Sequence, residues 1–167
     1  GVSGFVHEDL PTTEVDRREA LKRPLADAVR DLVDATIRTT VDDDEVRAVH
    51  EELEALVARL RADQLPGSAG GRYNSERRAW HWGNAVIGAH NAIAPPMTVV
   101  HDEHGAHADI VLGAAYEGPP GLVHGGVTAM MLDHLMGETA SRMRRPTFTG
   151  TLTMRYRRGT PLGPLHL

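Results

Sequence analysis

The sequence has no cysteine and only one lysine, Lys22, beside seventeen arginines. Without cysteine there can be no disulfide, no thiolate metal site and no cysteine nucleophile. No apolar run reaches the roughly 18 to 20 residues of a membrane-spanning helix, and the N-terminus lacks the basic and then apolar segments of a signal peptide. We therefore expect a cytoplasmic globular protein that does not insert into membranes.

Charge is distributed unevenly along the chain, whose net charge is −5. Residues 1–65 carry sixteen acids and nine bases, whereas residues 66–167 carry seven acids and nine bases, which indicates two parts. A small basic patch could attract a polyphosphate ligand such as coenzyme A. Nucleic-acid binding usually requires a more strongly basic surface, so we expect no nucleic-acid partner. Ordinary solvated side chains are the alternative for the six late arginines: Arg142, Arg144, Arg145, Arg155, Arg157 and Arg158.

The N-terminal part has the pattern of a helical hairpin over residues 1–65. Apolar residues recur every three or four positions from Asp43 to Arg61, and Asp42 resembles the cap of that helix. An earlier helix is expected over residues 24–39. We expect the apolar stripe of the second helix to pack against its hairpin mate or the main domain; binding of a partner helix is the alternative.

A linker and lead-in are predicted over residues 66–90, because small and polar residues cluster there without periodicity. The main domain then covers residues 91–167. Its first strands are expected at 97–103 and 107–113, joined as a hairpin by a turn at Gly105.

A loop, a helix and a strand are predicted in the rest of the main domain. Two prolines and two glycines make residues 117–121 a loop. Residues 126–142 indicate a helix that is apolar on nearly every side and hence buried. Alternating residues over 149–157 predict a half-buried strand.

Asp133 and two glycines carry the chemistry that the residues themselves suggest. Asp133 shares a helix face with small residues, and a buried carboxylate is costly unless it is paired or hydrogen-bonded. Gly125 and Gly126 open the helix, where free N–H groups suit a developing oxyanion and the lack of a side chain lets a carbonyl approach. The alternatives are a structural aspartate that caps a loop or pairs with arginine, and glycines that only make a tight turn.

Three histidines, His101, His104 and His107, are closely spaced, but a turn at Gly105 would separate them and no cysteine accompanies them. We therefore expect no metal site. His134 points about 100° away from Asp133 on the helix and is expected to be a satisfied core or interface histidine. Glu138 and Arg142 have the spacing of an ion pair.

A family resemblance rests on residues between 91 and 167. The matching features are a glycine-proline loop that ends in His124-Gly125-Gly126, Asp133 after six intervening residues, the stretch Thr149–Tyr156, and Pro161-Leu-Gly163. Together they resemble the PaaI-type and Them-type hotdog thioesterases. The resemblance implies an α+β hotdog fold, in which an antiparallel sheet wraps a long central helix, here with an N-terminal helical extension.

The resemblance also implies a function, the hydrolysis of an acyl-CoA thioester to a free acid and coenzyme A. Gly125 would supply the oxyanion N–H from one subunit, and Asp133 of the other would act as general base or nucleophile, with Thr149 orienting water or the carboxylate. His124 would support the loop and contact substrate, with a direct catalytic role as the alternative. The expected protein is a homodimer or tetramer with no cofactor besides the coenzyme A of its substrate, which we expect to be bound by Gly126, Arg155, Arg157 and Arg158.

Two departures from the family pattern limit these assignments. An asparagine that many members carry before the His-Gly-Gly run is absent, so no role is assigned to it. Three strands are predicted where the fold needs five or six, so roughly 30 to 60 residues would follow Leu167 or another chain would complete the sheet. The alternative function is a non-enzymatic acyl-CoA-binding or partner-binding module; a hotdog dehydratase fits the Asp133 and Thr149 arrangement less well.

Overall fold

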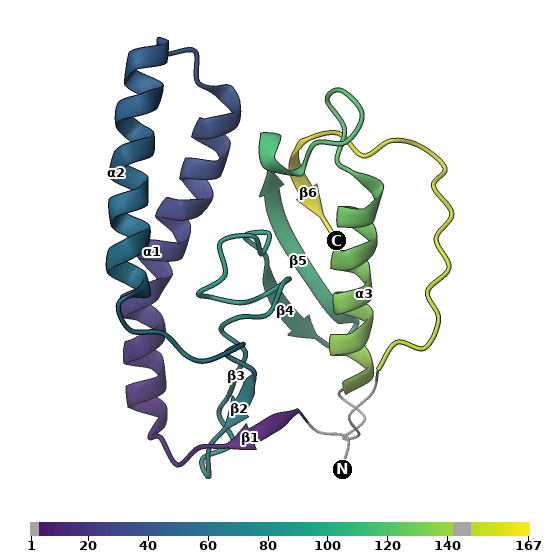
Figure 1. Cartoon of the computed structure of the whole chain (residues 1–167). Helices are drawn as coiled ribbons and strands as arrows, with labels where there is room; N and C mark the ends of the chain where they lie inside the picture. Colours follow the sequence, from purple (N-terminus) through teal and green to yellow (C-terminus); the bar gives the residue numbers. More distant parts are fainter. Residues whose placement is uncertain (1–3, 142–147) are drawn as a thin grey trace.

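A computed structural model describes residues 4–141 and 148–167 (Figure 1). It has an antiparallel sheet in the order β4-β5-β6, a small sheet in the order β1-β2-β3, and three α-helices. Within the described ranges, none of the helices is long and apolar enough to cross a membrane. In chain order the elements are β1 (Phe5–His7), α1 (Thr12–Arg38), α2 (Asp43–Arg61), β2 (Gly71–Tyr73), β3 (Ala79–Trp80), β4 (Thr98–Asp102), β5 (Gly105–Leu112), the 3-10 helix η1 (Ala114–Tyr116), α3 (Gly125–Ser141) and β6 (Gly163–His166).

The antiparallel sheet confirms the predicted hairpin. β4 pairs with β5 from Thr98 opposite Asp109 to Asp102 opposite Gly105, so that a two-residue turn joins the strands. Oδ1 of Asp102 accepts hydrogen bonds from the N–H groups of the turn at His104 and Gly105, at 2.7 and 3.1 Å. On its other edge, β5 pairs with β6, which closes the described sheet.

The core lies between β5 and one face of α3. Met131 and Leu135 of the helix are buried in one cluster with Ile110 and Leu112 of β5. The remaining faces of α3 are only partly covered, and the side chain of Met136 is 51% exposed. The expectation that this helix is buried on nearly every side is therefore wrong for the single chain, because one sheet can cover only one face.

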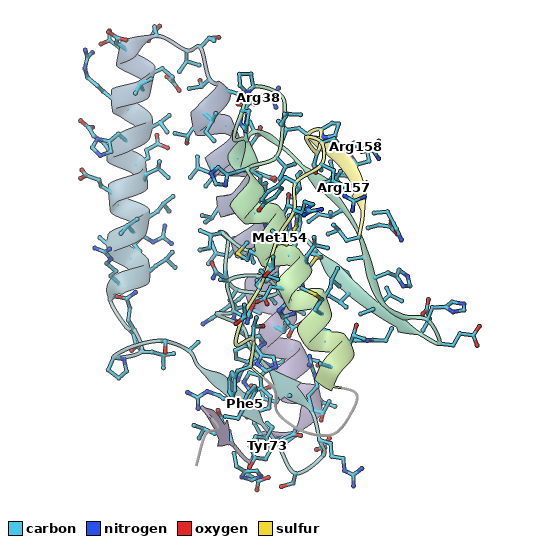
Figure 2. The ribbon with its side chains drawn as sticks, turned by 90° about the vertical axis from the view of Figure 1, so that its right-hand side faces the viewer. Phe5, Arg38, Tyr73, Met154, Arg157 and Arg158 are labelled. Atoms are coloured by element: carbon cyan, nitrogen blue, oxygen red, sulfur yellow. The ribbon has the colours of Figure 1, made fainter. Side chains whose placement is uncertain are left out.

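The strand expected over 149–157 does not form. Residues 148–158 run beside α3 on the side away from the sheet, as Figures 1 and 2 show from two directions, and they pair with no strand in the described structure. Their alternating pattern would suit a strand only beside a hydrogen-bonding neighbour. Side-chain hydrogen bonds to α3 hold the segment instead, at Thr149 and Tyr156.

The two N-terminal helices form, with one boundary changed. α2 has the predicted bounds, and Oδ1 of Asp42 accepts the N–H of Glu45 at 2.9 Å, which confirms the cap. α1 begins twelve residues before the expected position and carries Pro24 in its interior. Glu14 forms ion pairs with Arg17 and Arg18 in the next turn. Such pairs stabilise the helix and offset part of the cost of the backbone hydrogen bond that a proline removes.

α1 is integrated into the body of the protein, whereas α2 is not. Val15 of α1 is fully buried, Oε2 of Glu19 accepts the indole N–H of Trp82 at 2.9 Å, and Arg30 donates to the carbonyl of Ala94 at 3.1 Å. α2 buries no residue. The expected packing of its apolar stripe against α1 or the main domain is therefore wrong, since the helix stands apart from both in Figure 2.

The first and second parts of the chain also meet in a small sheet that the sequence did not indicate. β1 pairs in parallel with β2, from Phe5 opposite Gly71 to His7 opposite Tyr73, and β2 pairs with β3. The segment 66–90, predicted as linker and lead-in, thus holds two short strands.

Asn74 is the buried polar residue that ties this sheet to α1. Its side chain is 3% exposed and makes three hydrogen bonds. Nδ2 donates to the carbonyl of Leu10 at 2.8 Å and to Oγ1 of Thr12 at 3.1 Å, while Oδ1 accepts the N–H of Arg78 at 2.9 Å. These bonds join the start of α1 to the turn before β3.

We expect Asn74→Ala to lower the free energy of unfolding by about 1 to 3 kcal/mol, because it leaves buried backbone groups without partners. Urea denaturation measures this change. Gln64→Ala, on the exposed surface, is the control and should change stability by less than about 0.5 kcal/mol. Equal effects of the two substitutions would contradict a structural role for Asn74.

Candidate active site

His124 caps the start of α3. Its carbonyl oxygen accepts the N–H groups of Val127 and Thr128 at 2.9 and 3.2 Å, and its ring Nδ1 accepts the N–H of Gly126 at 3.0 Å. Among the described residues, no partner is found for the remaining first-turn N–H, that of Gly125. An unbonded N–H at the positive end of a helix dipole suits an anionic acceptor.

One hydrogen bond and one steric limit fix the backbone around the start of α3. The Tyr156 hydroxyl donates to the carbonyl oxygen of Gly125 at 2.8 Å, a contact that the sequence analysis missed although Tyr156 lies within the family-like stretch. In the preceding loop, a Cβ on Gly118 would lie 2.7 Å from the Cα of His124. The loop can therefore pass this close to His124 only with glycine at position 118.

Asp133 and Thr149, expected to act together, are in contact. The Thr149 hydroxyl donates to Oδ1 of Asp133 at 2.6 Å, and the carboxylate lies half-buried on α3. Because this hydrogen bond uses one carboxylate oxygen, it orients the group and leaves Oδ2 able to accept from water. Among the described residues no arginine pairs with Asp133, so the hydrogen bond from Thr149 is what orients its carboxylate.

Gly125 and Asp133 of one chain lie too far apart to act on one carbonyl group. Eight residues separate them on α3, which corresponds to a rise of about 12 Å along the helix. A reacting carbonyl would have to lie roughly 3 Å from both its hydrogen-bond donor and its attacking group. In the single chain, the Gly125 N–H and the Asp133 carboxylate therefore lie about two turns apart along α3 and cannot contact the same carbonyl group.

The predicted substrate-binding residues differ in whether they are free to contact a ligand. The N–H of Gly126 is already bonded to His124. Arg155, Arg157 and Arg158 are exposed, and Figure 2 shows the last two at the end of the segment nearest β6. The other three arginines of the predicted basic patch, Arg142, Arg144 and Arg145, lie outside the described residues.

The remaining predicted histidines are distributed among several acidic partners. His104 pairs with Glu103, and His107 with Asp102. Glu138, expected to pair with Arg142, which lies outside the described residues, lies 3.3 Å from both His101 and His134. The expectation of a satisfied His134 is met in part, because its Nε2 lies within ion-pair distance of Oε1 of Glu138 but makes no hydrogen bond within the described part of the chain.

His81 also lies near Glu138. Burial, which favours the neutral imidazole, lowers the pKa of His81, while the charge of Glu138 opposes that shift. Over the described ranges, no three His, Asp or Glu side chains form a group that could hold a metal ion.

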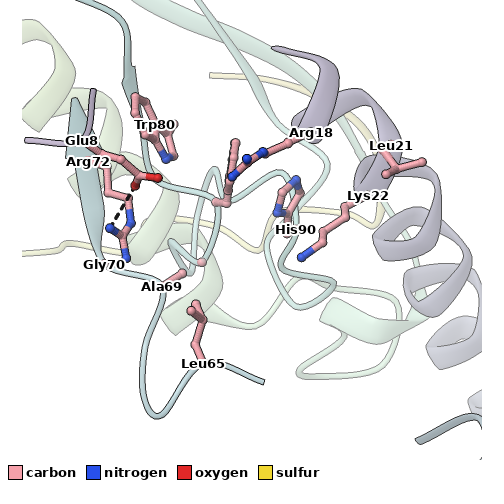
Figure 3. Close-up of a pocket in the computed structure, with 12 residues that line it drawn as sticks. Glu8, Arg18, Leu21, Lys22, Leu65, Ala69, Gly70, Arg72, Trp80 and His90 are labelled. Atoms are coloured by element: carbon pink, nitrogen blue, oxygen red, sulfur yellow. Dashed lines mark hydrogen bonds and ion pairs between the residues drawn. The ribbon is translucent and has the colours of Figure 1, made fainter. Parts of the chain in front are cut away.

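A cavity of about 440 Å³ lies between α1 and the small sheet, away from these residues (Figure 3). Arg18, Lys22 and Arg72 line it together with two tryptophans, and Arg72 is paired with Glu8 at 3.0 Å. None of Gly125, Asp133 and Thr149 lines this cavity. It therefore contributes nothing to the chemistry of the site on α3.

Comparison with known proteins places the fold and the site in context. No protein-family model matches the chain, and no curated protein sequence does. A crystal structure described as that of a thioesterase superfamily protein is similar over 86% of this chain and 72% of its own, with 33% sequence identity and a TM-score of 0.74. This similarity confirms the predicted α+β hotdog fold. The chain belongs to the thioesterase superfamily.

Proposed function

We propose that this protein hydrolyses acyl-CoA thioesters at active sites built by two copies of the chain. The observation that carries the proposal is the pair of poised groups on α3, the free N–H of Gly125 and the Thr149-oriented carboxylate of Asp133. Membership of the thioesterase superfamily supports thioester hydrolysis at the coarse level. Acyl-CoA as substrate and the PaaI type remain part of the proposal.

The reaction follows from the chemistry of the two groups. Asp133 takes a proton from water while the water oxygen attacks the thioester carbonyl carbon. The oxyanion that forms accepts the N–H of Gly125, where the dipole of α3 adds to the stabilisation. The C–S bond then breaks, coenzyme A leaves as a thiolate, and the proton on Asp133 passes to it. Thiolate is a good leaving group, so no further acid is needed.

Two copies are needed because the two groups of one chain lie about 12 Å apart along the helix. A two-fold axis that sets α3 antiparallel to α3 of a second copy would place Gly125 of one beside Asp133 of the other. The face around Asp133 carries Ala129, Gly137 and Ala140, and a Cβ on Gly137 would meet no atom within 4 Å in the single chain. A second helix could thus approach closely there.

The coenzyme A phosphates are assigned to the exposed arginines of the segment beside α3. Arg155, Arg157 and Arg158 follow Thr149 along this segment and lie on either side of Tyr156. Because these arginines are exposed, we expect them to act through long-range attraction of the polyphosphate. The Gly126 N–H bonded to His124 is given no substrate contact.

We expect Asp133→Asn to lower kcat for acyl-CoA hydrolysis at least roughly hundredfold, the usual contribution of a general base. Asparagine keeps an oxygen for Thr149, so circular dichroism and thermal unfolding should change little. Glu138→Gln, which removes another half-buried acid of α3, is the matched control and should keep kcat within about threefold. Unchanged turnover by Asp133→Asn, in enzyme free of host thioesterases, would refute the proposal.

A further inference from the structure

α2 carries a seam of apolar residues that no part of the described chain covers. The seam alternates steps of three and four residues, the spacing by which two helices pack side by side. Leu53 is half-buried and the other members are between 38% and 55% exposed. A solvated helix needs no such seam. Its members are Val46, Val49, Leu53, Leu56 and Leu60.

The accessible surface of the chain is larger than that of a compact monomer of its mass. A compact monomer of 18.2 kDa exposes about 8,100 Å², whereas this chain exposes 12105 Å². The excess of about 4,000 Å² is sufficient for an extensive homodimer interface, in which both copies together bury about 2,000 to 5,000 Å². Much of the exposed apolar surface lies on α1 and α2, and α1 carries its own exposed members at four-residue steps: Leu21, Leu25, Val29, Val33 and Ile37.

The charges at the two ends of α2 are opposite in sign. Its first turn carries Asp43, Asp44 and Glu45, and its last turn carries Arg59 and Arg61. Glu45 and Arg59 flank the seam near its two ends, whereas Asp44 lies on the opposite face of α2, the face of Glu51. In an antiparallel pair centred on Leu53, Glu45 of each copy would lie beside Arg59 of the other. The charges that flank the seam therefore favour the antiparallel orientation.

We propose that α2 pairs antiparallel with α2 of a second copy of this chain, with Leu53 near the two-fold axis. Each end of the seam then faces the opposite end of its partner, Val46 beside Leu60. The pairing is an interface separate from the one on α3, because α1 and the sheet lie between α2 and α3 in Figure 1. It does not depend on thioester hydrolysis.

Cross-linking tests the pairing directly, because the chain has no cysteine of its own. Leu53→Cys should give a disulfide-linked dimer on mild oxidation of the whole 167-residue chain. Val46→Cys and Leu60→Cys should each cross-link poorly alone and efficiently when mixed. Glu51→Cys, on the opposite side of α2, is the control. The products are read by non-reducing electrophoresis and by mass spectrometry.

Two results would overturn the proposal. Cross-linking of Leu53→Cys no greater than that of Glu51→Cys would show that the seam does not meet a second copy. Self-linking of Val46→Cys and of Leu60→Cys, without gain on mixing, would show a parallel pair. Misfolding is not expected to mask either result, because α2 buries no residue, and circular dichroism checks helicity.

Charge reversal tests the orientation independently. In the Leu53→Cys background, Arg59→Glu should reduce cross-linking roughly tenfold, since Glu45 of each copy then meets a second glutamate. Glu45→Arg should do the same, because it then meets Arg59 of the other copy. Mixing the two reversed proteins should restore cross-linking between them, and this rescue separates pairing from loss of helix stability. No rescue on mixing, with both variants helical, would contradict the antiparallel arrangement.

Discussion

The structure depends on one constraint, that a helix apolar on most of its faces must be covered on most of them. α3 is such a helix, and β5 covers the face that holds Met131 and Leu135. The segment from Thr149 to Tyr156 runs along another side and is attached at Asp133 and Gly125. The surface that remains is the one on which we propose that two α3 helices pair, since their contact would bury apolar area and small residues together.

The same helix sets the chemistry, because its length separates the groups that have to cooperate. The capping of α3 by His124 consumes three of its first N–H groups and leaves that of Gly125. The Asp133 carboxylate lies two turns further on. If the two groups act on one carbonyl, as we propose, a second copy is needed for a geometric reason, independent of any affinity between the copies. The Tyr156 hydroxyl donates to the carbonyl oxygen of Gly125 and so fixes the peptide group between Gly125 and Gly126.

Local signals in the sequence predicted α2, the β4-β5 hairpin, the loop before His124 and the contact of Thr149 with Asp133. Each depends on nearby residues or on a family-like spacing. The failures involve contacts that are distant in sequence. The strand expected at 149–157 lacked a neighbour, β1 and β2 pair across two helices, and α1 extends through Pro24. The apolar stripe of α2 predicted a packing partner but could not identify it, since periodicity is identical for an internal mate and a second copy.

The shared active site is tested most directly by mixing two inactive variants. Gly125→Pro removes the N–H at a helix position that tolerates proline. Gly125→Ala keeps the N–H but brings a Cβ to 3.2 Å from the Tyr156 ring, so it measures how much of the loss comes from the added side chain alone. Refolded together, Gly125→Pro and Asp133→Asn should recover roughly a quarter of wild-type acyl-CoA hydrolysis, since half of the dimers are mixed and each holds one intact site. A mixture as inactive as its components, although light scattering and mass spectrometry show mixed dimers, would contradict a site built by two copies.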